Sequence, residues 1–295
     1  MAAGAKNLER IIGFTEAGLL APGATVCDIG LSELSGGSIE AACRSFLEYY
    51  AKRLAPAPPA EADAVIASAG RGGLLRDLMR LAGFRYTALD VFAAEGAILF
   101  DLNRHAPGPA LAGQFDLALN FGTTEHVFNQ YLAHKTIYDL LKVGGIAYHD
   151  LPFSGYAAHG YFKYNPLFFR HLAAANGCKI VLERMTAGGD AHPPPGMAGE
   201  TIGEWRDYGI ECAMTRRAAA AFRIGLELST SLAVEADAIA PAPEAEAAGA
   251  PDVRYAAVPL ADKDAPPPPD AQRPLPRAAR ALAARVLAAV RRRLG

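Results

Sequence analysis

The sequence predicts a doubly wound α/β domain, because short apolar runs alternate with segments of helical periodicity. Seven runs have the length and composition of strands: residues 24–30, 86–90, 97–101, 115–120, 146–150, 179–183 and 208–214. Helical patterns separate most of them, and several of these patterns stop at glycines. A chain built in this way folds into a mostly parallel sheet with helices on both faces.

The helices between these strands follow from apolar spacing and local punctuation. One begins after Ser38, which we expect to cap it. A second covers residues 74–82, and a third runs through residues 132–141 toward paired glycines. A fourth covers residues 167–176.

Composition divides the chain into three parts. Residues 1–235 mix aromatic, β-branched and glycine residues, as a globular domain does. Residues 236–276 hold ten of the 21 prolines and little apolar bulk, which predicts an extended, disordered linker. Residues 277–295 carry six arginines and no acid, and their leucines and valines fall at helical spacing, which predicts a basic amphipathic helix. That helix is either a solvated end or a peripheral contact with an anionic membrane or a partner protein.

Charge and cysteine usage exclude several classes of protein. The net charge of −2 gives no global field for nucleic acid, so we expect no nucleic-acid partner. The four cysteines have no paired spacing, which excludes a disulfide scaffold or a four-cysteine zinc site and suits a reducing cytoplasm. We find neither a signal sequence nor an apolar stretch long enough for a membrane helix.

Polar residues and glycines gather where the predicted strands end. Gly30 follows the first strand, Asp90 ends the second, Asp101 ends the third, and Asn120 ends the fourth. In open α/β sheets, ligands bind beyond the carboxyl ends of the strands. The sequence therefore predicts a ligand site at this edge of the sheet.

These residues carry a resemblance to a known family. The order Asp28-Ile-Gly30, Asp90, Asp101-Leu-Asn103 and then residues 115–127 resembles a class I S-adenosylmethionine-dependent methyltransferase. Residues 122–130 and 152–166 resemble a largely uncharacterised bacterial branch of that family. The resemblance covers residues 20–215 and implies a seven-stranded Rossmann-like sheet whose last strand is antiparallel.

The resemblance also implies which residues bind S-adenosylmethionine as cofactor. Gly30 would lie under the methionine portion, Asp90 would hold the ribose hydroxyls, and Asp101 would sit at the adenine edge. The full cofactor set is Asp28, Gly30, Asp90, Asp101, Leu102, Asn120, Phe121 and Gly122. Asp28 would support either the first turn or the amino group, and the last three residues would close over the sulfonium.

The first loop departs from the family pattern, since bulky residues replace its usual glycines and sixty residues separate Gly30 from Asp90. One alternative makes residues 64–73 the first strand and loop, because that run ends in glycines at 70, 72 and 73, precedes a helix and lies at a conventional distance from Asp90. We prefer the assignment to residues 24–30.

The departure also leaves open a second function, that of a non-catalytic module with a weakened cofactor loop. A nicotinamide-dependent oxidoreductase lacks support, because no Gly-x-Gly-x-x-Gly joins a strand to a helix.

Histidines after the fourth and fifth strands suggest how the site would act. We expect His126 or His159 to act as general base on an acceptor hydroxyl, with Glu125 orienting the imidazole. A metal site formed by His126, His149, Asp150 and His159 fits no local motif, so we predict none. The aromatic residues between 153 and 169 suit a sugar. The sequence thus predicts O-methylation of a small molecule or glycan.

Overall fold

The computed structural model describes residues 2–54, 56–156, 159–190, 206–225 and 254–256. Of the predicted linker 236–276 it describes only residues 254–256, which form a short strand, and the predicted basic helix 277–295 lies outside the described residues. The part before residue 260 forms one compact unit, which holds every element described below.

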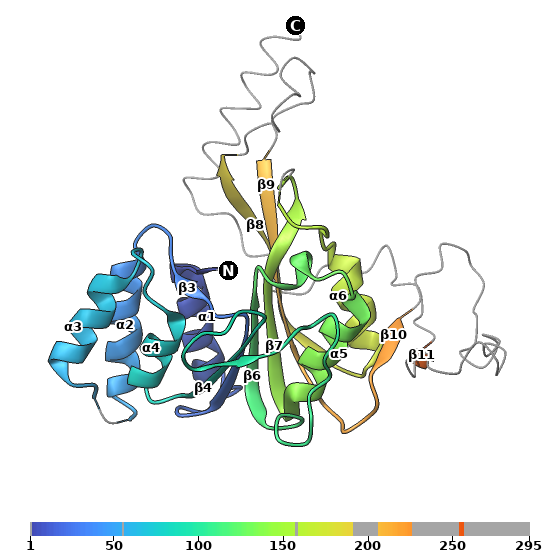
Figure 1. The fold of residues 1–295 in the computed structure, drawn as a ribbon, viewed down its shortest axis with the longest axis horizontal. Coiled ribbons are helices and arrows are strands. Elements are labelled where there is room, and N and C mark those ends of the chain that lie inside the picture. The colour runs from blue at the N-terminus through green and yellow to red at the C-terminus, as the bar shows by residue number, and fades with distance from the viewer. Residues whose placement is uncertain (1, 55, 157–158, 191–205, 226–253, 257–295) are drawn as a thin grey trace, which may run out of the picture. The chain divides into compact units, whose positions relative to one another are not determined.

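A seven-stranded sheet forms the centre of this unit (Figure 1). In spatial order its strands are β5 (Ala97–Leu99), β4 (Arg85–Asp90), β2 (Thr25–Ile29), β6 (Phe115–Phe121), β7 (Leu141–Ser154), β9 (Arg206–Thr215) and β8 (Lys179–Asp190). The strands from β5 to β7 pair in parallel, whereas β9 is antiparallel to both β7 and β8. The predicted fold is confirmed. As predicted, the strand that comes last in the sequence of this sheet, β9, is antiparallel, and it lies between β7 and β8.

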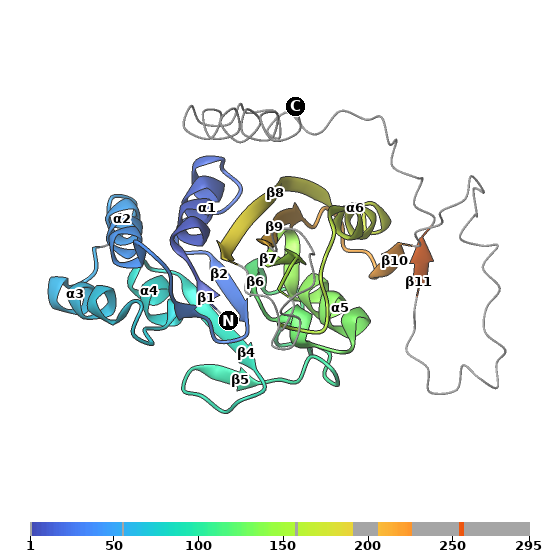
Figure 2. The ribbon, with the colours of Figure 1, turned by 90° about the horizontal axis from the view of Figure 1, so that it is seen from above.

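Helices cover both faces of the sheet, as Figures 1 and 2 show. One face carries α1 (Ala5–Glu16), α2 (Ile39–Ala51), α3 (Pro59–Ser68) and α4 (Leu75–Leu81). The other face carries α5 (Gln130–Leu140) and α6 (Pro166–Ala175). Short elements complete the fold: β1 (Ala2–Ala3), β3 (Glu33–Leu34), the 3-10 helix η1 (Thr124–His126), β10 (Arg223–Gly225) and β11 (Arg254–Ala256). Among the described residues, no helix has the length and apolar character needed to cross a bilayer.

The strands are apolar because their side chains enter two separate cores. Val26 packs with the core under α1 to α4, and the next residue, Cys27, packs with the core under α5 and α6. On β6, Leu117 likewise packs in the core under α1 to α4, and Ala118 packs in the core under α5 and α6. Successive side chains of a strand point to opposite faces, so a strand covered on both faces needs an apolar residue at nearly every position.

Three expectations about the elements need correction. Ser38 precedes α2 with φ of +62° and makes no capping hydrogen bond through its side chain. The helix α5 stops at Leu140, and β7 begins at the next residue, before the paired glycines. Residues 64–68 are the end of helix α3, so the alternative first strand is wrong and β2 is the first strand of the main sheet.

Candidate cofactor pocket and the cluster at its rim

A pocket of about 340 Å³ lies beyond the carboxyl ends of β2, β4 and β6. Five residues of the expected cofactor set line it, namely Gly30, Asp90, Asp101, Leu102 and Gly122. His126 lines the same pocket. These residues come from four loops that are distant in sequence, so the parallel sheet brings them together, as expected of strand ends that meet at one edge.

Asp90 is buried at the floor of the pocket, with part of its hydrogen-bonding capacity in use. Its Oδ2 accepts from the backbone N–H of Leu31 at 2.8 Å, and its Oδ1 accepts from that of Phe92 at 3.0 Å. A carboxylate has about four acceptor positions, so acceptor capacity remains for a ligand with hydroxyl groups. The bond to Leu31 also ties the end of β4 to the loop after β2.

Gly30 adopts a backbone conformation that suits glycine, with φ of +96°. Its N–H donates to the carbonyl of Leu89 at 2.7 Å, which holds the turn against β4. Gly122 has φ of +74°, and a Cβ there would come within 3.3 Å of Glu125 Oε1. Both glycines therefore let the backbone turn where a side chain would be strained.

Asp28 lies behind the pocket and supports the turn. Its carboxylate accepts from the backbone N–H of Ser32 at 2.9 Å, from the Ser32 hydroxyl and from the Tyr86 hydroxyl. Burial raises the pKa of Asp28 to about 6, although the bonds from Tyr86 and Ser32 oppose that rise. Of the two roles considered for Asp28, the geometry favours support of the turn over contact with a ligand.

Asn120 and Phe121 also lie behind the pocket, which differs from their expected place over the ligand. The Asn120 amide contacts the Thr124 hydroxyl at 2.9 Å and His149 Nδ1 at 3.0 Å. Phe121 is buried in the core under α1 to α4, edge-on to Tyr148. Since successive strand residues point to opposite faces, both side chains leave the strand end sideways into the cores.

The apolar wall of the pocket was missed at the sequence level. It consists of Leu89, Val91, Phe92, Phe100 and Val127. Val91 and Phe92 are exposed. Two exposed apolar residues directly after a strand-end carboxylate are the pattern that would have identified this wall.

The expected catalytic residues come together at the rim of the pocket. The rings of His126 and His159 are 4.7 Å apart between centroids, and His159 Nε2 lies 3.5 Å from Glu125 Oε1. We call Glu125, His126 and His159 the imidazole cluster. Burial and then the charge of His159 lower the pKa of His126, so its imidazole is neutral at pH 7. Burial raises the pKa of Glu125.

His149 and Asp150 lie apart from the imidazole cluster, so the four-residue metal site considered above does not form. His149 is buried among aromatic rings, 5.0 Å from Phe169 between centroids. The Asp150 carboxylate accepts from Lys6 Nζ at 3.1 Å and from Asn7 Nδ2 at 2.8 Å.

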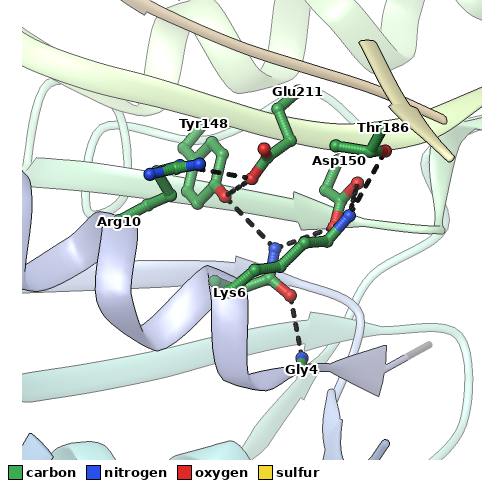
Figure 3. Close-up of polar contacts among 8 residues, drawn as sticks. Gly4, Lys6, Arg10, Tyr148, Asp150, Thr186 and Glu211 are labelled. Atoms are coloured by element: carbon green, nitrogen blue, oxygen red, sulfur yellow. Dashed lines mark hydrogen bonds and ion pairs between the residues drawn. The ribbon is translucent and has the colours of Figure 1, made fainter. Parts of the chain in front are cut away.

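Asp150 belongs to a second polar cluster, which joins α1 to β7 and β9 (Figure 3). We call Lys6, Asn7, Arg10, Tyr148, Asp150 and Glu211 the α1 network. The Tyr148 hydroxyl donates to Glu211 Oε1 at 2.7 Å, and Arg10 Nε lies 3.7 Å from that oxygen. The network fixes α1 on the sheet through partners far apart in sequence.

The aromatic segment divides between core and surface. Tyr164 and Phe169 are buried, whereas Tyr161 is 73% exposed. Phe128, which the sequence did not single out, is 78% exposed and lies edge-on to Tyr161 at 6.4 Å between ring centroids. Phe128 follows the pocket residue Val127 directly, so these two exposed rings lie close to the imidazole cluster.

Comparison with known proteins gives structural likeness only. No family model matches the chain, and no curated protein matches it. A Burkholderia thailandensis 1,6-didemethyltoxoflavin-N1-methyltransferase is 16% identical over 72% of this chain and 77% of its own, with a TM-score of 0.39. A putative methyltransferase from Bacillus halodurans is 12% identical over 72% and 99%, with a TM-score of 0.38.

Proposed function

We propose that this protein is an S-adenosylmethionine-dependent methyltransferase that acts on a hydroxyl group of a small molecule or glycan. The observation that carries the proposal is the convergence of Gly30, Asp90 and Asp101 on one pocket that His126 also lines. The chain's free cysteines, three of them buried, support a reducing, cytoplasmic location.

The pocket suits the cofactor in size and in chemistry. Its volume of about 340 Å³ lies within the range of about 300–1,000 Å³ that is usual for ligand sites. The free acceptor capacity of Asp90 suits the two ribose hydroxyls, and the wall formed by Val91, Phe92 and Phe100 suits the adenine ring. When bound, S-adenosylmethionine supplies the methyl group from its sulfonium and leaves as the neutral thioether, while the acceptor hydroxyl loses a proton.

The imidazole cluster supplies the group that would accept that proton. His126 lines the pocket and is neutral at pH 7, and the His159 ring lies 4.7 Å from the His126 ring between centroids, so both imidazoles lie at the pocket rim. The exposed rings of Phe128 and Tyr161 offer an apolar surface to an acceptor. Methyl transfer is an in-line displacement, so positioning of the acceptor against the cofactor is the main task of these residues.

Calorimetry with S-adenosylmethionine and S-adenosylhomocysteine tests the cofactor assignment. We expect binding in the micromolar range, and we expect Asp90→Ala to abolish it. Asp63→Ala is the matched control, because Asp63 is an exposed aspartate on α3 whose ion partner Arg44 is also exposed. Unaltered binding by Asp90→Ala would show that the pocket assignment is wrong. No binding of either molecule by the unaltered protein would instead favour a non-catalytic module.

Transfer of labelled methyl groups to a panel of monosaccharides and hydroxylated aromatics tests the role of the cluster. At saturating cofactor, His126→Ala and His159→Ala should each slow transfer to the best acceptor. Near-normal turnover in both variants would exclude either histidine as general base.

A further inference from the structure

We propose that Glu125, His126 and His159 form a binding site for a divalent transition-metal cation at the rim of the pocket. Each of the three residues offers one ligand atom, and these atoms all lie within 4.8 Å of one another. Two imidazole nitrogens and one carboxylate oxygen form a ligand set that zinc and iron(II) sites in proteins use.

The carboxylate of Glu125 is the strongest indication that the cluster binds a cation. The side chain is 1% exposed, and its Oε2 has no hydrogen-bond partner among the described residues. Within the residues that the structure describes, the one ion-pair contact of Glu125 is with His159, whose Nε2 lies 3.5 Å from Glu125 Oε1. A buried carboxylate oxygen without a donor is costly, and a bound cation would satisfy it.

The fold holds His159 against Glu125 through the backbone. The N–H groups of Tyr161 and Phe162 donate to the Glu125 carbonyl, the first at 2.7 Å. Gly160 has φ of +66°, and a Cβ there would lie 2.8 Å from Glu125 Cγ and 3.2 Å from Glu125 O. Glycine is therefore required at position 160 for the loop to approach η1 so closely. These backbone contacts thus hold Glu125 and His159 side by side, although they are 34 residues apart in sequence.

The geometry allows closure around an ion with small side-chain rotations. A tetrahedral ion about 2.0–2.2 Å from each ligand requires donor atoms about 3.3–3.6 Å apart. The 3.5 Å contact between His159 Nε2 and Glu125 Oε1 already lies in that range, and both imidazoles are exposed. The cation would leave at least one position open for a further ligand. Lys163, whose Nζ donates to the His159 carbonyl, is a nearby positive group that opposes binding.

The role of such an ion rests on the proposed function. His126 belongs both to the cluster and to the pocket lining, so an acceptor hydroxyl that reaches the pocket would lie beside the cation. A divalent cation lowers the pKa of a hydroxyl bound to it and orients its oxygen. The proton would pass to water, and the oxygen would then attack the cofactor's methyl carbon. With the ion bound, both imidazoles would be its ligands, so water would replace them as the proton acceptor of the proposed function.

Metal binding by the untagged, chelator-treated protein tests the proposal. We expect Zn²⁺ to bind at one equivalent in equilibrium dialysis, and Co²⁺ to give visible d–d absorption of a low-coordinate site with nitrogen ligands. Glu125→Gln, His126→Gln and His159→Gln should each weaken binding at least tenfold. His105→Gln is the matched control, because His105 is exposed and lies outside the cluster. Both cluster histidines are exposed, so their variants should keep the fold even if Glu125→Gln does not.

The proposal would be overturned if the unaltered protein bound no Zn²⁺, or if the cluster variants bound it as tightly as His105→Gln does. Calorimetry with S-adenosylmethionine on the same samples separates this result from the proposed function. Asp90→Ala should lose cofactor binding and keep Zn²⁺ binding, whereas His159→Gln should do the reverse. Cofactor binding without metal binding would therefore reject the metal site alone.

Discussion

The imidazole cluster and the α1 network both contain carboxylates with little exposure, but they neutralise them differently. Glu125 belongs to η1, whereas Asp150 and Glu211 belong to β7 and β9. In the α1 network, Lys6 pairs with Asp150 and Arg10 pairs with Glu211. These cations are charged at any physiological pH. In the imidazole cluster, Glu125 faces only a titratable imidazole among the described residues. Among the described residues, Oε2 of Glu211 also lacks a hydrogen-bond partner. The charge of the Glu211 carboxylate is nevertheless balanced by the guanidinium of Arg10.

The contrast shows how a structural cluster differs from a candidate functional one. The α1 network joins three elements, and permanent charges inside the protein balance its carboxylates. The imidazole cluster lies on a pocket, is open to solvent through both histidines, and leaves its carboxylate to be balanced by something that binds. Removal of a carboxylate should therefore cost stability in the first cluster and activity in the second.

The largest effect is expected on stability, from Glu211→Ala. The variant leaves the Tyr148 hydroxyl without its acceptor and Arg10 without its counter-ion. Loss of one partner of a buried ion pair costs about 3–5 kcal/mol, and since the Arg10 side chain is 28% exposed we expect about 3 kcal/mol here. Urea denaturation measures this loss as the difference in the free energy of unfolding between the variant and the unaltered protein. A loss below about 1 kcal/mol would contradict the structural role of the network.

Glu125→Gln should show the opposite pattern. We expect methyl transfer to the best acceptor to fall about a hundredfold, because the variant loses the carboxylate that orients His159 and with it part of the about 10²–10⁴-fold contribution of a positioned acid–base group. The free energy of unfolding should stay the same or rise slightly, because burial disfavours the charged carboxylate and raises its pKa. Turnover is measured at saturating cofactor. A variant that is as active as the unaltered protein, or as unstable as Glu211→Ala, would remove the distinction between the two clusters.

His159→Gln should change the pH profile as well as the rate. Burial and then the charge of His159 lower the pKa of His126, and transfer needs a neutral imidazole. In the unaltered protein the rate should therefore fall only as the pH drops below 6.5, through the lowered pKa. Without His159 the repulsion between the two imidazolium forms is lost, so this acidic limb should move to higher pH. The rate between pH 5 and 8 is the measurement, and an unshifted limb would show that the two rings do not interact.

The smallest effect is expected from Lys6→Met. The Lys6 side chain is 42% exposed, so its ion pair with Asp150 is screened by solvent. We expect a loss of about 1 kcal/mol or less in urea denaturation and a smaller loss at high salt. Methyl transfer should not change, because Lys6 lies in the α1 network. A large loss of turnover would show that this network contacts the acceptor.

Local patterns in the sequence were sufficient for the sheet and for half of the pocket. Alternating strands and helices predicted the seven-stranded sheet, and the rule that ligands bind beyond strand ends located Gly30, Asp90 and Asp101. These predictions succeed because each depends on a strand and the residue that follows it. The direction of a side chain at a strand end could not be predicted in this way. The side chains of Asp28 and Asn120 point into the interior, because the pleat and twist of the folded strands decide their direction.

The sequence by itself determined which residue types stand at each strand end, since hydrophobic periodicity and turn residues act over a few positions. Tertiary structure alone decided which of them meet. Phe92 became a pocket wall, and His159 reached Glu125 because Gly160 lets its loop fold back on η1. Contacts between residues 34 positions apart depend on packing and on backbone hydrogen bonds between loops, and no local pattern encodes them.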